Sequence, residues 1–295
     1  MKIYDCTTFY SESMMLDLRF NVLNKNVHKF VVIESLFSHS GKRKKLNFNI
    51  NDYPRFKDKI IYLVIENEPV DLILNENEIK KPEVKRHNSL KRIEQSYNYM
   101  SNAIKEAQDE DLIILSDNDE IPNLDSKSFQ NSKKDFFIFK QLLFYYKFNL
   151  LYDLMPWFGS KACKKKKLIS FSNLRNLKNK IYPFWRIDTL FSDNKKMNLE
   201  IIEDGGWHFT NIKTPEDLFD KMKNFGHHDE FEISKLTLDD LRKSIKEKVV
   251  FYDHFADKSS KEKWNYNYKL KKVDLSLLPE YLNNNKNDYI KWLDN

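Results

Sequence analysis

Short apolar runs alternate with amphipathic stretches along the first part of the chain. The runs predict buried strands at residues 2–8, 30–34, 60–65 and 112–115. Between them, apolar positions recur at helical spacing over residues 13–23 and 88–107. Strand and helix patterns that alternate in this way are typical of an α/β protein. We therefore expect the layout of a nucleotide-binding half-domain.

The rest of the chain has a different pattern. Residues 136–151 are strongly aromatic and predict strands that cover the sheet, and residues 185–190 predict a further short strand. Residues 164–167 are four consecutive lysines and predict a basic linker, whereas residues 203–209 contain a glycine pair and predict a loop.

Two signals in the last third of the chain mark helix starts. Thr214 and Thr237 are each followed within three positions by acidic residues, which interact favourably with the positive end of a helix. We therefore expect two parts: a nucleotide-binding and catalytic core at residues 1–213, and a mostly helical extension at residues 214–295 that packs on it.

The run at residues 112–115 ends in a cluster of carboxylates closed by proline, Ser116-Asp117-Asn118-Asp119-Glu120-Ile121-Pro122. Strand ends of this kind form the sheet edge at which α/β folds hold ligands. Mg²⁺ or Mn²⁺ prefers oxygen ligands and commonly bridges protein carboxylates to substrate phosphates. The two aspartates therefore predict a nucleotide-diphosphate site, and a merely solvated acidic turn is the alternative.

A second group of candidate residues surrounds the glycine pair. Gly205 and Gly206 let the backbone approach a ligand closely, and Trp207 could stack on a sugar ring. His208 is a candidate metal ligand or phosphate contact, and Asp204 is a candidate general base. The alternatives are a structural histidine and an ordinary turn residue.

Other charged side chains are candidates for contacts with a nucleotide. Arg86 and Arg92 lie on the helix that precedes the acidic turn, and a guanidinium is well suited to a diphosphate, although a solvated helix face is equally consistent. The triplet His227-His228-Asp229 suggests an acceptor-side or structural role. Four residues in or beside the first strand–helix unit could contact a nucleotide or pair with each other: Glu12, Asp17, Arg19 and Glu34.

Composition limits the classes of protein that the chain can belong to. Its 295 residues are 41% hydrophobic and 14% aromatic, which is typical of a folded globular protein. The sequence has neither a long apolar segment nor the apolar part of a secretory signal, so we expect a soluble, cytoplasmic protein. Cys6 and Cys163 are read as two ordinary thiols.

The net charge of +6 comes from lysine clusters that could attract an anionic nucleotide or the acidic inner face of a membrane. Peripheral contact with that membrane face therefore stays open, whereas nucleic acid is not expected as a partner. The sequence does not indicate the oligomeric state.

Several ordered motifs resemble glycosyltransferase family 17, which includes the animal enzyme that adds bisecting N-acetylglucosamine to N-glycans. The resemblance covers most of the chain. Besides the acidic turn, its motifs are Tyr4-Asp5-Cys6-Thr7-Thr8-Phe9-Tyr10, Leu16-Asp17-Leu18-Arg19, Phe30-Val31-Val32-Ile33-Glu34-Ser35, His39-Ser40-Gly41-Lys42 and Gly205-Gly206-Trp207-His208-Phe209.

The resemblance implies a GT-A type fold with a Rossmann-like mixed sheet flanked by helices, to which the helix starts at Thr214 and Thr237 add a mostly helical C-terminal region. Asp117 and Asp119 would hold Mn²⁺ or Mg²⁺ on the donor diphosphate, with Asn118 between them. The animal relatives use UDP-N-acetylglucosamine and invert the anomeric carbon. They therefore imply a UDP-sugar donor, a glycan hydroxyl as acceptor and a single base. Asp204 is the first candidate for that base, and Glu120 and Glu34 are reserve candidates.

The chain departs from the family pattern in two respects. Asn118 replaces a small apolar residue between the aspartates, which leaves both carboxylates in place. The membrane anchor and stem of the animal enzymes are missing, which suggests a bacterial or viral enzyme that builds a surface polysaccharide or a lipid-linked glycan. Two other functions stay open at this point: a metal-dependent phosphoesterase, and a basic module that binds glycans or nucleic acid without catalysis.

Overall fold

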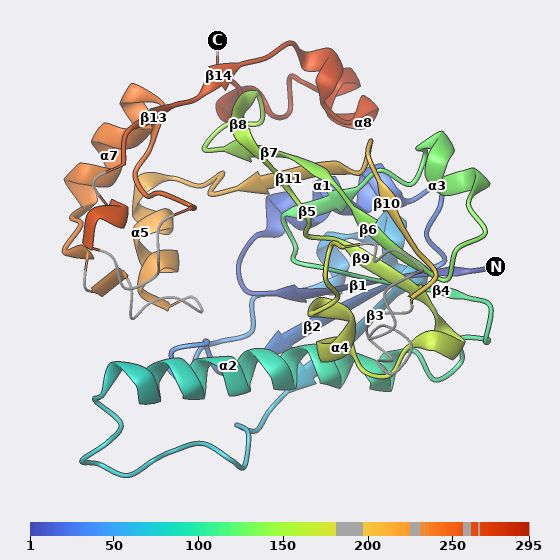
Figure 1. Cartoon of the computed structure of the whole chain (residues 1–295), viewed down its shortest axis with the longest axis horizontal. Coiled ribbons are helices and arrows are strands. Elements are labelled where there is room, and N and C mark those ends of the chain that lie inside the picture. The colour runs from blue at the N-terminus through green and yellow to red at the C-terminus, as the bar shows by residue number, and fades with distance from the viewer. Residues whose placement is uncertain (181–196, 225–230, 233, 256–260, 265, 295) are drawn as a thin grey trace.

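The computed structural model of the chain describes residues 1–180, 197–224, 231–232, 234–255, 261–264 and 266–294 (Figure 1). Within these residues the chain forms a seven-stranded mixed sheet, a five-stranded second sheet and flanking helices. The predicted fold class, a mixed α/β sheet flanked by helices, is therefore confirmed. The strand expected at residues 185–190 and the triplet His227-His228-Asp229 lie outside the described residues.

The main sheet has the strand order β10-β6-β9-β4-β1-β2-β3. The bounds of its strands are β1 Ile3–Phe9, β2 Lys29–Ser35, β3 Ile60–Ile65, β4 Leu112–Ser116, β6 Phe136–Phe139, β9 Lys161–Lys164 and β10 Leu199–Ile202. The strands β1 to β4 are parallel to one another, an arrangement typical of an alternating strand–helix pattern. Because β9 is antiparallel to both β4 and β6, strands β6 and β10 run in the same direction as β4.

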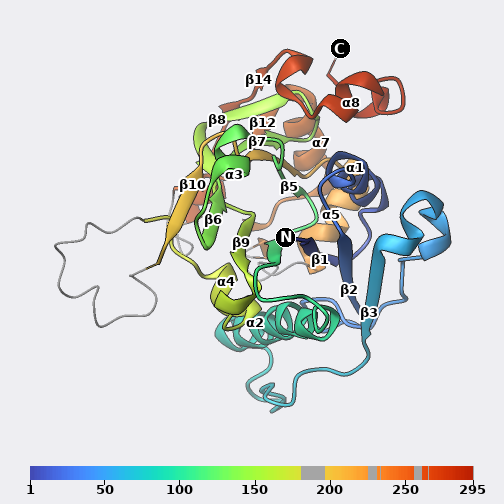
Figure 2. The same ribbon diagram turned by 90° about the vertical axis from the view of Figure 1, so that its right-hand side faces the viewer.

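The helices lie on both faces of this sheet (Figure 2). Their bounds are α1 Ser13–Leu23, α2 Pro82–Tyr99, α3 Lys127–Asn131, α4 Phe171–Arg175, α5 Pro215–Asn224, α7 Leu238–Glu247 and α8 Glu280–Asn284. Short 3₁₀ helices lie at Ile50–Asp52, Pro54–Lys59, Met100–Ala103, Lys165–Lys167, Lys261–Trp264, Leu275–Leu277 and Ile290–Trp292. Helix α2 begins six residues earlier than predicted, because Pro82 takes the first helical position, where its missing N–H is tolerated.

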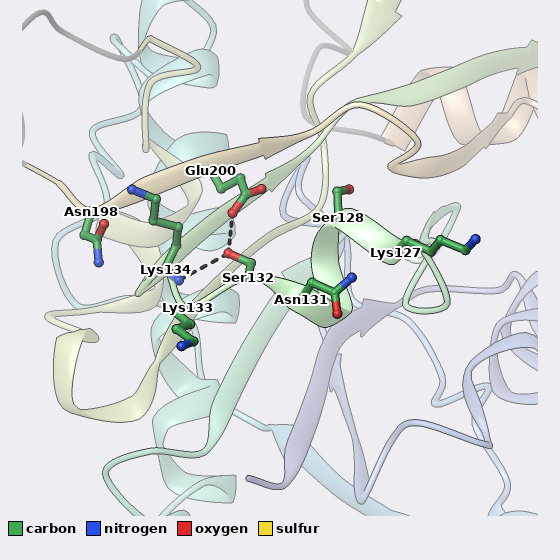
Figure 3. A pocket seen from close by; sticks show the side chains of 8 residues that line it. All are labelled: Lys127, Ser128, Asn131, Ser132, Lys133, Lys134, Asn198 and Glu200. Atoms are coloured by element: carbon green, nitrogen blue, oxygen red, sulfur yellow. Dashed lines mark hydrogen bonds between the residues drawn. The ribbon is translucent and has the colours of Figure 1, made fainter.

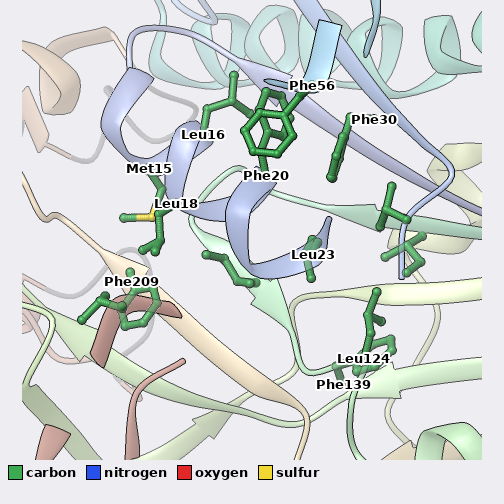
Figure 4. Close-up of a cluster of buried hydrophobic side chains, with 14 of the residues drawn as sticks. Met15, Leu16, Leu18, Phe20, Leu23, Phe30, Phe56, Leu124, Phe139 and Phe209 are labelled. Carbon is green, nitrogen blue, oxygen red and sulfur yellow. The ribbon is translucent and has the colours of Figure 1, made fainter. Parts of the chain in front are cut away.

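Alternate residues of the central strands face opposite sides of the main sheet. Phe30 and Val32 of β2 belong to the hydrophobic cluster beneath α1, which Figure 4 shows. Val31 and Ile33 point the other way and share a cluster with Tyr97 of α2. Both faces are therefore covered, which explains why these strands are apolar runs rather than alternating ones.

The second sheet has the order β14-β8-β7-β11-β5. Its strands are β5 Glu120–Pro122, β7 Gln141–Tyr145, β8 Leu150–Trp157, β11 Gly206–Thr210 and β14 Lys271–Lys272. The expected loop at residues 203–209 is therefore wrong in its second half, because residues 206–210 pair with both β5 and β7. The basic linker at residues 164–167 is also wrong, since Lys164 ends a central strand and a 3₁₀ helix follows it.

The extension after residue 213 contains helices α5, α7 and α8 together with short strands. Two of these strands, β12 Val249–Val250 and β13 Tyr268–Lys269, pair with each other, whereas β14 pairs with β8. The helix starts predicted at Thr214 and Thr237 are confirmed, and Thr237 forms a full capping box with Asp240. In the described part of the chain, no helix has the length and apolar character that crossing a membrane requires.

Candidate active site

The acidic turn between β4 and β5 is held in place by Arg19 of α1. This side chain is fully buried, and its Nε and Nη2 atoms donate to the two carboxylate oxygens of Asp5 on β1, at 2.7 and 2.5 Å. Its Nη1 atom donates to the main-chain carbonyls of Glu120 at 2.5 Å and Asp117 at 3.4 Å. A guanidinium presents several donors in a fixed plane, so one side chain ties the turn to two other elements.

Asp117 is the first carboxylate of the turn, and two side chains contact it. Arg175 of α4 donates to both of its oxygens, at 3.1 and 3.2 Å, and the Tyr97 hydroxyl donates to Oδ1 at 2.6 Å. The guanidinium also lies 4.5 Å from the centre of the Tyr97 ring. Burial would raise the pKa of Asp117, but Arg175 and the Tyr97 hydroxyl outweigh it, so the pKa is lowered and the carboxylate stays ionised.

Asp119 faces an imidazole and an ammonium group. His208 Nε2 lies 3.5 Å from Oδ1, and Lys221 Nζ lies 3.6 Å from Oδ2. Burial would raise the pKa of Asp119, but these two cations outweigh it and hold the pKa far below its usual range. The Asp119 carboxylate in turn raises the pKa of His208 against the opposing effect of burial. Asp119 is therefore ionised, and His208 readily accepts a proton.

Strand pairing brings His208 to the acidic turn. It lies opposite Glu120 in the register of β11 and β5, and the next residue, Phe209, donates its N–H to the Asp119 carbonyl at 2.8 Å. The imidazole lies 4.7 Å from the ring of Trp157. Its Nδ1 atom is buried and has no hydrogen-bond partner among the described residues.

Glu120 is the most deeply buried acid of the turn, with 2% of its surface exposed. Its Oε2 accepts from the Asp117 N–H at 2.9 Å, and its Oε1 accepts from Trp157 Nε1 at 2.7 Å. Burial, followed by the negative charge of Asp117, raises the pKa of Glu120. The chain approaches this carboxylate at Gly159, where a Cβ atom would lie only 2.3 Å from Glu120 Oε1.

The residues present suit a divalent ion that a substrate helps to bind. The described residues hold no group of three or more His, Cys, Asp or Glu side chains that could bind a metal alone. Mg²⁺ and related ions, however, are commonly held by one or two protein ligands together with substrate phosphates. Asp119 and His208 could supply such ligands, because the Nε2 atom of the imidazole lies 3.5 Å from a carboxylate oxygen of Asp119.

Asn118 lies between the two aspartates, and its side chain contacts the start of α1. Its Nδ2 atom donates to the Glu12 carbonyl at 3.3 Å, whereas its Oδ1 atom is buried and has no partner in the described part of the chain. The amide therefore joins the acidic turn to the start of α1.

Two acids predicted for the site lie apart from the cluster. Asp204 is exposed and accepts from Asn123 Nδ2 at 2.9 Å. It lies in the bend between β10 and β11, two residues before β11 begins and four residues before His208. Glu34 is buried, and it accepts from two main-chain N–H groups, from the Tyr62 hydroxyl at 2.9 Å and from Lys44. These contacts favour a structural role for Glu34 in anchoring residues 44–48.

The glycine pair makes room for the protein's own backbone. At Gly205 a Cβ atom would lie 2.3 Å from the main-chain nitrogen of Lys140. Gly206 has φ +107°, and its Cβ atom would lie 2.3 Å from the Ile121 carbonyl. Trp207 contacts the C-terminal extension: its Nε1 atom donates to the Leu277 carbonyl at 2.6 Å. These contacts are with protein, whereas the sequence suggested close approach to a ligand.

The two arginines expected at the diphosphate lie nearer the start of α2 than Tyr97, the residue of this helix that contacts Asp117. Arg92 donates to Glu68 at 2.6 Å and to the His39 carbonyl at 3.3 Å, and it precedes Tyr97 by about 8 Å of helix. Arg86 is a further six residues away. Arg175, the arginine that contacts the Asp117 carboxylate, was not predicted, because α4 is only five residues long and its sequence has no distinctive signal.

The described part of the chain also contains an open pocket of about 610 Å³, lined by residues of α3 and by the segments that lead into β6 and β10 (Figure 3). Figure 3 shows Ser132 donating to Glu200 on β10, with Lys133 and Lys134 beside it. Because β6 and β10 run in the same direction as β4, this pocket lies near the amino ends of the strands. It is therefore separate from the acidic turn, which follows the carboxyl end of β4.

The parallel strand order β4-β1-β2-β3, with helices on both faces, is an α/β fold of the Rossmann-like type. The chain belongs to glycosyltransferase family 17, since the model of that family matches residues 1–293. It is therefore a glycosyltransferase, as the motifs predicted, and enzymes of this class bind a nucleotide-sugar donor and a glycan acceptor.

Two further comparisons add little to this assignment. No curated protein sequence matches the chain. Among solved structures, the inositol-1-phosphate CTP transferase from T. maritima is similar at 14% identity and a TM-score of 0.33, over 76% of this chain and 96% of that chain. A similarity at this level supports no inference about the reaction.

Proposed function

We propose that this glycosyltransferase is metal-dependent and inverting, and that it moves N-acetylglucosamine from UDP to a hydroxyl group of a glycan. The main support is the cluster after β4, where Asp119 and His208 adjoin each other and Glu120 is buried beside them. The choice of UDP and of the sugar rests on the resemblance of the sequence motifs.

The metal site of this proposal consists of Asp119 and His208, with Asp117 close by. Mn²⁺ or Mg²⁺ bound there would stabilise the negative charge of the diphosphate leaving group. Arg19 fixes the main chain of the turn, so the carboxylates are oriented before the donor arrives.

Glu120 is the base of this proposal. Inversion needs one group that accepts a proton from the acceptor hydroxyl while that oxygen attacks the anomeric carbon directly, with no covalent intermediate. A raised pKa makes Glu120 a better proton acceptor than an ordinary carboxylate, and hydrogen bonds from Trp157 and Asp117 orient it. Asp204, the first candidate from the sequence, is exposed, lies in the bend before β11 and contacts Asn123, which follows β5.

The variants Glu120→Gln and Asp204→Asn separate the two candidate bases. With UDP-N-acetylglucosamine and Mn²⁺, water can serve as the acceptor, so release of UDP measures turnover without a known glycan. Glu120→Gln should lower kcat by roughly 100-fold or more while it changes the Kd for UDP little, because a general base contributes about that much. Asp204→Asn should retain turnover and is the matched control.

Three results would contradict parts of the proposal. Loss of turnover in Asp204→Asn but not in Glu120→Gln would make Asp204 the base. Sugar released in the α configuration, observed by NMR before it mutarotates, would exclude inversion. Turnover that is unchanged after chelation with EDTA and dialysis into metal-free buffer would exclude a metal.

A further inference from the structure

Two cations reach the acidic turn from elements outside the parallel part of the sheet. Arg175 comes from α4, and Lys221 comes from α5 in the C-terminal extension. Each faces a different aspartate, Arg175 at 3.1 Å from Asp117 and Lys221 at 3.6 Å from Asp119. The turn therefore presents two neighbouring pairs of opposite charge at the carboxyl end of β4.

These pairs are open to solvent on one side. The side chains of Arg175 and Asp117 are 38% and 35% exposed, and those of Lys221 and Asp119 are 23% and 17% exposed. Arg19, by contrast, is 0% exposed and all its contacts are internal. Arg175 and Lys221 are thus placed where a ligand can reach them, whereas Arg19 can act only through the main chain.

The contact between Lys221 and Asp119 leaves hydrogen-bonding capacity on the ammonium group. At 3.6 Å, the pair is longer than a hydrogen bond, so it is an electrostatic contact alone. An ammonium group in this position can donate to a further acceptor.

Charge balance shows why a donor needs these cations. A nucleoside diphosphate brings two or more negative charges next to Asp117, Asp119 and Glu120, and one divalent ion offsets only two charges. A guanidinium binds phosphate oxygens in a bidentate manner, and a lysine binds them as a point charge. The aromatic face of Tyr97 holds the Arg175 guanidinium in place whichever anion it contacts.

We propose that Arg175 and Lys221 bind the diphosphate of the sugar donor, and that each exchanges its aspartate partner for phosphate oxygens when the donor enters. This inference rests on the proposed function, because it takes a nucleoside diphosphate as the ligand. In the free enzyme the two ion pairs hold the carboxylates in place, and donor binding releases Asp117 and Asp119 from their cations.

The test compares UDP with uridine, which lacks the diphosphate. Both affinities are measured with Mn²⁺ by calorimetry or competition, for wild type, Arg175→Met, Arg175→Lys and Lys221→Met. The matched controls are Arg242→Met, whose guanidinium pairs with Glu216 and Asp239 on the surface, and Lys223→Met, on the same helix as Lys221. Thermal unfolding of each variant shows whether it is folded.

Arg175→Met and Lys221→Met should each weaken UDP binding about 10- to 100-fold, because a charge-assisted hydrogen bond is lost, and should leave uridine binding unchanged. Arg175→Lys should recover part of the loss. The controls should bind both ligands like wild type. Equal losses for UDP and uridine would mean a structural role, and unchanged UDP affinity would mean that the cations do not touch the diphosphate; either result overturns the inference.

Failure of the proposed function gives a different result. If wild type binds GDP or CDP instead of UDP, the proposed donor is wrong, and the same variants are compared with that nucleotide and its nucleoside. If wild type binds no nucleoside diphosphate with Mn²⁺, both the donor site and this inference are overturned.

Discussion

Gly206 occupies a backbone conformation that few other residues adopt. Its φ of +107° is unfavourable for any residue with a Cβ atom, and the added atom would lie 2.3 Å from the Ile121 carbonyl and 2.6 Å from the Asn123 nitrogen. The position is where β11 begins beside β5, two residues before His208. A single hydrogen atom at Gly206 therefore allows the pairing that brings His208 to the acidic turn.

Replacement of Gly206 by alanine should lower the free energy of unfolding by about 2–4 kcal/mol, since backbone strain and a clash with main-chain atoms add together. Gly41→Ala is the control, because Gly41 also has a positive φ, of +89°, but the Cβ atom there would meet only the end of the Arg92 side chain. Unfolding in urea measures both values. If the two variants lose equal stability, the close approach of β11 to β5 is not what requires glycine.

At the scale of elements, α1 is connected to β1 and to the acidic turn through the ion pair of Arg19 and Asp5. Both side chains are buried, at 0% and 1% exposure, so neither charge is hydrated if the other is lost. Breaking a buried pair by removing one partner is therefore costly, although replacing both by apolar groups often is not.

Arg19→Met should lower the free energy of unfolding by about 3–5 kcal/mol, because Asp5 is left as an unpaired buried charge. The double variant Asp5→Leu/Arg19→Met should recover part of this loss, but not all, because the carbonyls of Asp117 and Glu120 still lack their donor. Lys25→Met, which removes an exposed pair with Asp125, should change stability by less than about 0.5 kcal/mol. A loss in Arg19→Met no larger than in Lys25→Met would contradict this account.

The elements that the sequence predicted best are those whose signal is local. Strands β1 to β4 and helix α1 follow directly from runs and spacings within a few residues. β9 was missed because it has only two apolar residues, Ala162 and Cys163, with a lysine at each end, which is too short a run to indicate a strand. β11 was missed because the glycine pair at its start is typical of a loop. Both strands exist because of partners distant in sequence, which no local window contains.

The candidate site shows the same limit. Asp117 and Asp119 were identified from the strand that precedes them, and His208 from its motif. Arg175, 58 residues from Asp117, has no local signal, because an arginine in a short helix resembles many surface residues. Lys221 could have been placed on a helix from the cap at Thr214, but not beside Asp119.

At the scale of the whole molecule, the extension after residue 213 completes the core and the site. Apolar residues from its end join the hydrophobic cluster beneath α1, namely Leu278, Leu282, Tyr289 and Leu293. β14 pairs with β8, the Phe148 N–H donates to the Trp292 carbonyl at 2.9 Å, and α5 brings Lys221 to Asp119. In Figure 1, α8 lies on the side of α1, and the chain ends beside β14.

A chain that ends at Lys213 should therefore fail to fold cooperatively. The hydrophobic cluster beneath α1 would be exposed where α8 packs on α1, and burial of each large apolar side chain contributes about 1.5–3 kcal/mol. Loss of the four that the extension supplies therefore removes about 6–12 kcal/mol, which is comparable to the usual stability of a whole domain. Thermal unfolding followed by circular dichroism, together with binding of a hydrophobic dye, compares this chain with the full one. The full chain should show a sharp transition and little dye binding, whereas the shortened chain should show a broad transition and strong dye binding.

A sharp transition in the shortened chain, within a few degrees of the full chain and with UDP binding retained, would contradict this prediction. Residues 1–213 would then be an independent domain, and Lys221 would be dispensable for binding the donor.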